Sequence, residues 1–290
     1  MQRLLRRTMT MIVMACMILV MAVPAFAGET ASVDSTKTEN AEVLADDNGV
    51  VQVLYVYTDD SGSSYAIGYG TGFFINETNI ITCNHVVSLD SDMEAEATEA
   101  LGISVKQLRE RLSVKISVYR DSTPLEAEIV SQSPIMDYAI LQLKQPMSNK
   151  TPLNIRHSST VKKTEAVYTI GFPGVVESLK VINGGTGDDS SINRGEVVST
   201  DNVVIDGESI ECIVSDNVVS SGNSGGPLVD NSGNVVGICK GILDDKYAYS
   251  IQIDQVLKDL DARGVAYTLA DDLAETVTEP AQTVTPAPIE

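Results

Sequence analysis

The strongest candidate for chemistry in this 290-residue sequence is a serine held between glycines. Ser224 lies in the stretch Ser-Gly-Asn-Ser-Gly-Gly-Pro-Leu, residues 221–228. A serine hydroxyl attacks a carbonyl carbon only with a general base beside it and N–H donors for the oxyanion that forms. Glycines permit the tight loop that such a site needs, and the backbone N–H groups of Gly222 and Ser224 are the candidate donors. The alternative is a glycine-rich hairpin with an incidental serine.

A base for this serine has to come from one of two histidines. His85 ends an apolar β-branched run, whereas His157 lies in a polar stretch, so His85 is the better candidate. Asp137 opens the apolar run 138–143, where a carboxylate can hold an imidazole in one tautomer. A hydrogen-bonded histidine at a strand end and an aspartate in a turn are the alternative interpretations. Taken together, the three residues predict a catalytic site of Ser224, His85 and Asp137.

In the order histidine, aspartate, serine, these residues resemble the trypsin-like serine proteases of chymotrypsin fold, and among them the HtrA/Deg branch. The similar segments follow one another in order between residues 48 and 262. They are residues 68–75, 81–87, 137–143, 170–173, 195–199, 216–228 and 235–238. Two departures stand out: the separation of His85 from Asp137 is longer than is usual in the family, and Cys83, Ser221 and Cys239 stand where its members commonly carry other residues.

The resemblance implies an exported serine endopeptidase that forms an acyl-enzyme on Ser224 and acts on unfolded or extracytoplasmic polypeptides. His85 is expected to act as base and then acid, and Asp137 to orient its ring. No cofactor or metal is expected, because the histidines are far apart and no cysteines are closely paired. The competing predictions are a non-catalytic binding module with a protease fold and a glutamate-specific secreted endopeptidase of the same fold.

Short β-rich runs separated by turns begin near residue 48 and predict an all-β chain. The expected strands are 50–57, 65–75, 80–87, 114–119, 125–130, 138–143, 166–171, 195–200, 209–214, 226–230, 235–240 and 247–251. The resemblance selects two six-stranded antiparallel Greek-key barrels, chymotrypsin-like, over 48–155 and 156–265, with the site in their cleft.

Three segments interrupt or close this pattern. Apolar residues at three- and four-residue steps predict a helical insertion over 91–112, which explains the long spacing from His85 to Asp137. A closing helix is expected over 253–260, and a flexible Gly- and Asp-rich loop over 181–193.

The two ends of the chain differ from this domain. Residues 1–27 carry three early arginines, an apolar run and a small-x-small ending at Ala27, which predicts a secretory signal peptide with an uncleaved anchor as the alternative. We therefore expect a secreted or extracytoplasmic protein without stable membrane association after cleavage. Residues 28–47 are expected to form a flexible lead segment. Residues 271–290 are expected to form a disordered acidic Pro/Thr tail, too short for the PDZ domain of many HtrA/Deg relatives.

Charge and cysteine content restrict the partners. The formal net charge of −20 argues against nucleic acid as a partner and leaves polypeptide substrates, and the resemblance adds a homo-trimer as one assembly to test. Cys83, Cys212 and Cys239 remain after signal cleavage, an odd number that leaves at least one thiol outside intramolecular disulfides. A cysteine nucleophile at Cys83 is the alternative, but it lacks a glycine loop, so we expect packing thiols.

The residue before the nucleophile bears on activation. In digestive trypsin-like enzymes it is an aspartate that pairs with a new amino terminus after propeptide cleavage. Here it is Asn223, whose amide forms no ion pair with an ammonium. We therefore expect no internal zymogen cut, and control of activity by rearrangement of the 181–193 loop or by oligomerisation.

Overall fold

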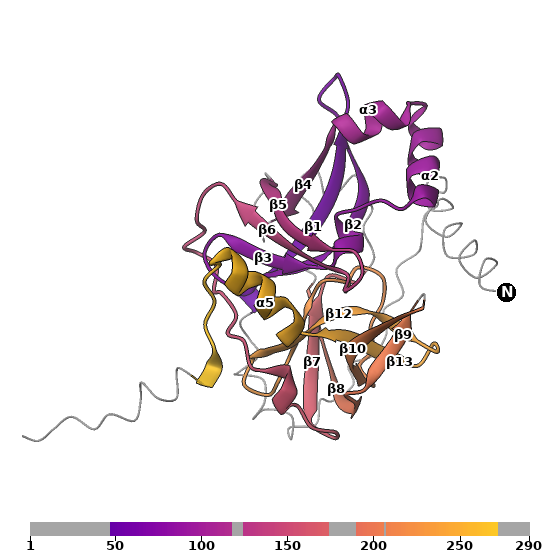
Figure 1. The fold of residues 1–290 in the computed structure, drawn as a ribbon. Helices are drawn as coiled ribbons and strands as arrows, with labels where there is room; N and C mark the ends of the chain where they lie inside the picture. Colours follow the sequence, from indigo (N-terminus) through magenta and orange to yellow (C-terminus); the bar gives the residue numbers. More distant parts are fainter. Residues whose placement is uncertain (1–46, 118–123, 174–189, 206, 272–290) are drawn as a thin grey trace, which may run out of the picture. The chain divides into compact units, whose positions relative to one another are not determined.

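Six antiparallel strands close into a barrel in the first half of the chain (Figure 1). The computed structural model describes residues 47–117, 124–173, 190–205 and 207–271. The barrel order is β1-β2-β3-β6-β5-β4, formed by β1 (Val50–Thr58), β2 (Ser64–Phe74), β3 (Asn79–Thr82), β4 (Leu112–Ser117), β5 (Leu125–Ser133) and β6 (Tyr138–Leu143). Apolar side chains such as Val53, Phe73 and Ile140 are fully buried in its core. Such β-branched and aromatic residues favour strands because they pack well on the buried face of a sheet.

The second sheet has the order β13-β12-β11-β7-β8-β10-β9, and β13 also pairs with β10. Its strands are β7 (Ala166–Gly171), β8 (Ser191–Ser199), β9 (Asn202–Ile205), β10 (Glu208–Ser215), β11 (Pro227–Val229), β12 (Val235–Leu243) and β13 (Tyr247–Gln252). The extra pairing joins six strands into a second ring and leaves β9 appended to β10. The predicted pair of six-stranded antiparallel barrels is therefore confirmed, whereas β9 is a strand that the sequence did not predict.

The helical insertion consists of α2 (Ser91–Leu101) and α3 (Val105–Glu110). Asp90 caps the first helix by accepting N–H bonds from its first turn, and Gly102 ends it in the left-handed conformation. Ser104 and Gln107 form a capping box at the start of the second helix. Leu108 is the insertion's fully buried side chain, while α2 buries none of its residues.

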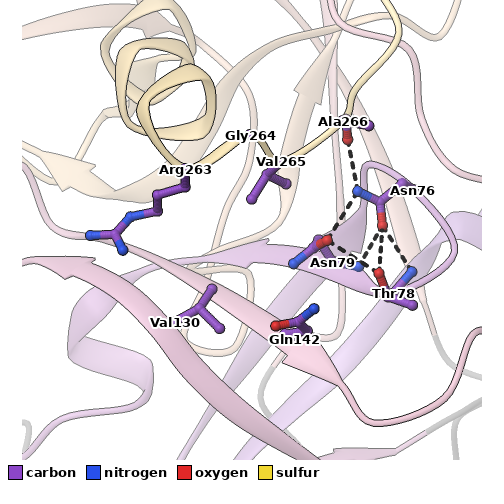
Figure 2. Close-up of a pocket in the computed structure, with 9 residues that line it drawn as sticks. All are labelled: Asn76, Thr78, Asn79, Val130, Gln142, Arg263, Gly264, Val265 and Ala266. Carbon is purple, nitrogen blue, oxygen red and sulfur yellow. Dashed lines mark hydrogen bonds between the residues drawn. The ribbon is translucent and has the colours of Figure 1, made fainter.

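The closing helix is α5 (Asp254–Arg263), which buries Val256, Leu257 and Leu260 as the apolar pattern predicted. A cavity of about 590 Å³ lies where the residues after α5 meet the turn between β2 and β3 (Figure 2). The Asn76 side chain accepts the N–H groups of Thr78 and Asn79 and donates to the Ala266 carbonyl at 2.7 Å. These bonds tie the C-terminal segment to the barrel at the end of β3 opposite to the one that leads to His85.

Several predictions concern residues outside the described part of the chain. The signal peptide (1–27), nearly all of the lead segment (28–47), nearly all of the tail (271–290) and most of the 181–193 loop lie there. These predictions, and the domain limits 48–155 and 156–265, stay predictions. The expected loop is wrong for residues 191–193, because they pair with β7 as the first residues of β8. Within the described residues, no helix is both long and apolar enough to cross a membrane.

Candidate active site

His85 lies in a 3₁₀ turn, η3 (Asn84–Val86), that follows β3 directly. The expected strand over 80–87 is therefore too long, since β3 ends at Thr82. The chain turns there because the Val86 and Val87 N–H groups donate to the carbonyls of Cys83 and Asn84, at 3.3 and 3.0 Å. The turn places the imidazole at the surface, where its side chain is 47% exposed.

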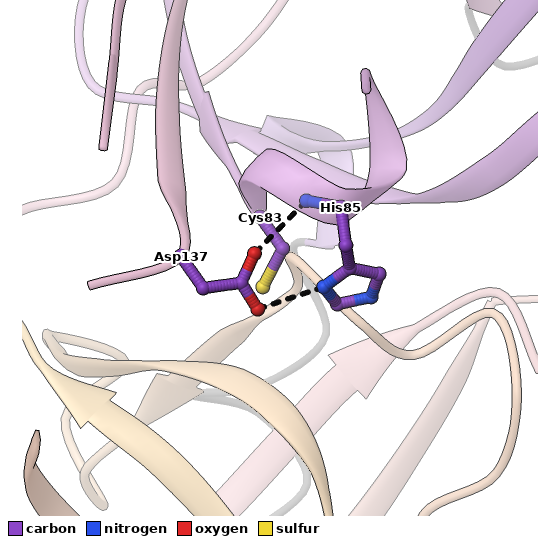
Figure 3. Close-up of side chains that lie close together, drawn as sticks. All are labelled: Cys83, His85 and Asp137. Carbon is purple, nitrogen blue, oxygen red and sulfur yellow. Dashed lines mark hydrogen bonds and ion pairs between the residues drawn. The ribbon is translucent and has the colours of Figure 1, made fainter. Parts of the chain in front are cut away.

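Asp137 holds this histidine through both oxygens of its carboxylate (Figure 3). Oδ1 accepts the His85 backbone N–H at 2.9 Å, and Oδ2 lies 2.8 Å from Nδ1 of the ring. The backbone of Asp137 has φ of 60° between β5 and β6, a conformation that aspartate tolerates better than most residues. Burial acts to raise the pKa of Asp137, but the hydrogen bonds from His85 and the charge of Lys240 outweigh it and lower that pKa.

The Ser224 loop is shaped by two glycines. Asn223 donates its N–H to the Ser220 carbonyl at 3.1 Å, and Gly222 has φ of 98°, the pattern of a type II turn. Gly225 has φ of 87°, and a Cβ there would lie 2.2 Å from the Thr71 carbonyl oxygen. Only glycine fits this position, which lets the loop pack directly on β2.

Side-chain and backbone bonds fasten this loop to the first barrel. The Thr71 N–H donates to the Ser224 carbonyl at 2.8 Å, and its hydroxyl donates to the Gly222 carbonyl at 2.7 Å. The Gly222 and Ser224 N–H groups donate no hydrogen bond to any group in the described part of the chain. Since Gly222 is buried, an unpaired N–H there is unusual for a folded protein.

The structure brings His85 and Asp137 into direct contact, but it does not hydrogen-bond Ser224 to His85. The Ser224 hydroxyl donates instead to the Lys240 carbonyl at 3.1 Å. No hydrogen bond between Ser224 and His85 occurs among the described residues. Hydrogen bonds between catalytic groups are often long in the absence of substrate, so this arrangement is compatible with catalysis after a rotation of the hydroxyl.

Lys240 is a site residue that the sequence reasoning missed. Its ammonium lies 3.4 Å from Oδ2 of Asp137, and the two side chains are 12% and 8% exposed. The prediction ended a strand at Lys240, whereas β12 continues to Leu243. A lysine in the interior of an apolar strand was the available signal, because such a side chain is seldom buried without a partner.

A thiol lies beside this pair. The Cys83 sulfur, a ring nitrogen of His85 and a carboxylate oxygen of Asp137 all lie within 4.8 Å of one another (Figure 3). Burial and the nearby Asp137 charge raise the pKa of Cys83 well above its usual value, and its Sγ donates to the Cys239 carbonyl at 3.4 Å. Because the Lys240 ammonium at the same carboxylate repels cations, the cluster favours a neutral packing thiol over a metal centre.

The other histidine, His157, lies beside α5. Its Nδ1 is 2.9 Å from Asp254 Oδ1, and the same carboxylate accepts the N–H groups of Ser158 and Ser159 at 3.2 and 3.0 Å. Asp254 is the first residue of α5, so these bonds tie the helix to residues 157–159. Thus His157, Ser158, Ser159 and Asp254 form a hydrogen-bonded cluster that holds the start of α5 in place.

Comparison with known proteins identifies a family match and several similar proteases. Residues 70–238, more than half of the chain, match the family described as Trypsin-like peptidase domain. Serine protease Do-like HtrA of Bacillus subtilis is 31% identical over 186 residues, which are 62% of this chain and 35% of that protein. The probable periplasmic serine endoprotease DegP-like of Pseudomonas fulva is 31% identical over 172 residues, 58% of this chain and 28% of that protein. The chain thus spans roughly a third of the length of these relatives.

Solved structures show the same fold. The active form of the Rv3671c protease from M. tuberculosis superposes with a TM-score of 0.56 at 21% identity, covering 86% of this chain and 97% of that one. Its inactive form gives a TM-score of 0.55 at 22% identity, with coverages of 81% and 98%. On the strength of the family match and the HtrA and DegP-like relatives, the chain belongs to the trypsin-like peptidase family.

Proposed function

We propose that the protein is an extracytoplasmic serine endopeptidase that cleaves polypeptides through an acyl-enzyme on Ser224. The observation that supports this best is the double hydrogen bond from His85 to Asp137, which orients the ring with Nδ1 toward the carboxylate. In that orientation Nε2 is the nitrogen left to take a proton. His85 is then the base, and Asp137 stabilises the imidazolium that forms.

In this mechanism the Ser224 hydroxyl rotates away from the Lys240 carbonyl and attacks the scissile carbonyl carbon. Its proton passes to Nε2 of His85, and the oxyanion accepts the N–H groups of Gly222 and Ser224, which donate to nothing else in the described structure. His85 then gives the proton to the leaving amine. Water attacks the acyl-enzyme with His85 again as base, which restores the serine.

The cellular location in this proposal rests on two observations. The first 27 residues have the charge and hydropathy pattern of a secretory signal peptide, and several relatives carry the description periplasmic. Polypeptides outside the cytoplasm are therefore the proposed substrates.

Active-site labelling tests the proposed nucleophile. A fluorophosphonate should label the purified protein on Ser224, and Ser224→Ala should abolish both labelling and casein hydrolysis. Ser221→Ala is the matched control, because this exposed serine lies in the same loop three residues earlier. Equal labelling of wild type and Ser224→Ala would contradict the proposal.

Activation follows from the residue before the nucleophile. Asn223 is 2% exposed, and its side-chain oxygen meets no donor among the described residues. An amide there forms no ion pair with a new amino terminus, so we propose that no internal cut is required. Labelling of Ser224 in protein whose intact mass is unchanged throughout the assay would support this; labelling only after a defined cut would refute it.

A further inference from the structure

Lys240 contacts both ends of the proposed catalytic group. Its carbonyl oxygen accepts the Ser224 hydroxyl at 3.1 Å, and its ammonium lies 3.4 Å from Asp137 Oδ2. It reaches the carboxylate from β12 in the second barrel, whereas Asp137 lies between β5 and β6 in the first. Lys240 is thus a direct link between the two barrels at the site.

The position of Lys240 on β12 depends on a β-bulge. Cys239 pairs with Ser250 and Gly241 pairs with Tyr249, so the register shifts and Lys240 is the extra residue between them. A bulge redirects side chains relative to the regular alternation of a strand and is common beside active sites. The bulge explains how an ammonium reaches a buried carboxylate from this sheet.

Lys240 also dominates the charge around the pair. Four other titratable groups of the described residues interact with this cluster: Cys83, Cys212, Cys239 and Tyr249. Burial raises the pKa of each of them, to about 11 for Cys212 and about 12 for Cys239, so all four are uncharged at neutral pH. Among the described residues, His85 and Lys240 are the basic groups within ion-pair distance of Asp137.

We propose that Lys240 is a positioning residue of the reaction: its ammonium holds Oδ2 of Asp137 and shares that oxygen with the His85 ring. The inference rests on the proposed function of the site. When His85 takes up a proton, two cations share one carboxylate, and their repulsion disfavours the imidazolium. Removing the Lys240 charge should therefore make protonation of His85 easier.

Histidine NMR tests this without requiring activity. The chain has two histidines, so His157→Gln leaves a single imidazole signal that belongs to His85. In a Ser224→Ala background, which removes self-cleavage, Lys240→Met should raise the pKa of His85 by about one unit, a tenfold change in proton affinity. Lys240→Arg should keep the wild-type value. Lys106→Met, which removes an exposed charge on α3, should change nothing.

The pH profile of hydrolysis gives the second readout. In otherwise wild-type protein, the acid limb of kcat/KM should move upward by about the same unit in Lys240→Met, because the active base is the neutral imidazole. A role confined to packing would lower activity equally at every pH and leave both pKa values in place. Lys240→Gln, which keeps a polar side chain without the charge, gives the same answer if the methionine variant misfolds.

The outcomes separate this inference from the proposed function. A His85 pKa that is unchanged or lowered in both Lys240→Met and Lys240→Gln overturns the inference, even when the wild type hydrolyses casein. If the pKa rises as expected but the wild type neither hydrolyses casein nor labels on Ser224, the proposed function fails and the ion-pair effect stands.

Discussion

The chain contains two histidine–aspartate pairs with nearly the same contact but different surroundings. Nδ1 of His85 lies 2.8 Å from Asp137, and Nδ1 of His157 lies 2.9 Å from Asp254. The two histidine side chains are also similarly exposed, at 47% and 42%. The carboxylates differ: the Asp137 side chain is 8% exposed and the Asp254 side chain 27%.

The remaining partners of each carboxylate separate the two pairs. Asp137 accepts the backbone N–H of its own histidine and faces the Lys240 ammonium, whose carbonyl accepts from Ser224. Asp254 accepts hydrogen bonds from the backbone N–H groups of Ser158 and Ser159 and so anchors the start of α5. A histidine–aspartate contact alone thus does not identify a catalytic base. What distinguishes the first pair is a more buried carboxylate that also faces Lys240, whose carbonyl accepts from the proposed nucleophile.

The largest difference between the two pairs should appear in kcat/KM when each histidine is replaced by alanine in turn. We expect His85→Ala to lower kcat/KM by about 10⁴-fold, because the serine loses its base. The kcat/KM of His157→Ala should stay within about threefold of wild type, because the contact between His157 and Asp254 stabilises the fold and takes no part in the proposed reaction. Peptide hydrolysis, with circular dichroism to confirm folding, measures both. A larger loss of activity in His157→Ala than in His85→Ala would show that His85 is not the base.

The two aspartates should differ nearly as much. Asp137→Asn is expected to lower kcat by about 10³- to 10⁴-fold, because an amide favours the wrong imidazole tautomer and does not stabilise the imidazolium. Asp254→Asn, the same chemical change in the second pair, should leave kcat unchanged. An equal loss of kcat in both variants would mean that the substitutions act through misfolding. Urea denaturation of each variant tests this directly.

The second pair should contribute to the stability of the fold, and this contribution should depend on pH. Burial acts to raise the pKa of Asp254, but hydrogen bonds from His157, Ser158 and Ser159 lower it overall. A carboxylate whose pKa is lower in the folded than in the unfolded state stabilises the folded protein. This stabilisation is complete above the unfolded-state pKa of about 4 and is lost as the pH falls through the folded-state pKa. We expect Asp254→Ala to cost about 1–2 kcal/mol at pH 7.

Urea unfolding from pH 7 to pH 2.5 checks this prediction. The gap between wild type and Asp254→Ala should narrow as pH falls below about 4, because the protonated carboxyl gives weaker hydrogen bonds. A gap that is constant over this range would mean that Asp254 acts through packing alone.

The smallest effect should come from replacing Cys83, the thiol beside the first pair; within the described ranges no cysteine joins the second pair in a comparable cluster. Cys83→Ser keeps a donor for the Cys239 carbonyl, so hydrolysis should stay within about threefold of wild type. The three thiols of the described residues should also resist a thiol-specific reagent until the protein unfolds, since each of them is buried. Loss of activity as large as that of Ser224→Ala would instead support a cysteine nucleophile.

The sequence by itself determined much of the fold. Alternating β-branched runs and turn residues located both sets of strands, and the caps at Asp90, Gly102 and Ser104 agree with the predicted helical insertion. These are local properties, which depend on a few neighbouring residues. Local patterns failed where pairing decided the outcome: β9 (Asn202–Ile205) is four residues long, too short for a clear alternating pattern, and it forms because β10 pairs with it.

The site depended more on tertiary structure. The sequence nominated Ser224, His85 and Asp137 by residue type, but the bond from His85 to Asp137 joins residues 52 positions apart and exists because β3 pairs with β6. Lys240 reaches Asp137 only through the bulge in β12 and the contact between the two barrels. Strand order and register fix such distances, and both arise from contacts between segments far apart in the chain, so no local pattern around Lys240 could specify its partner.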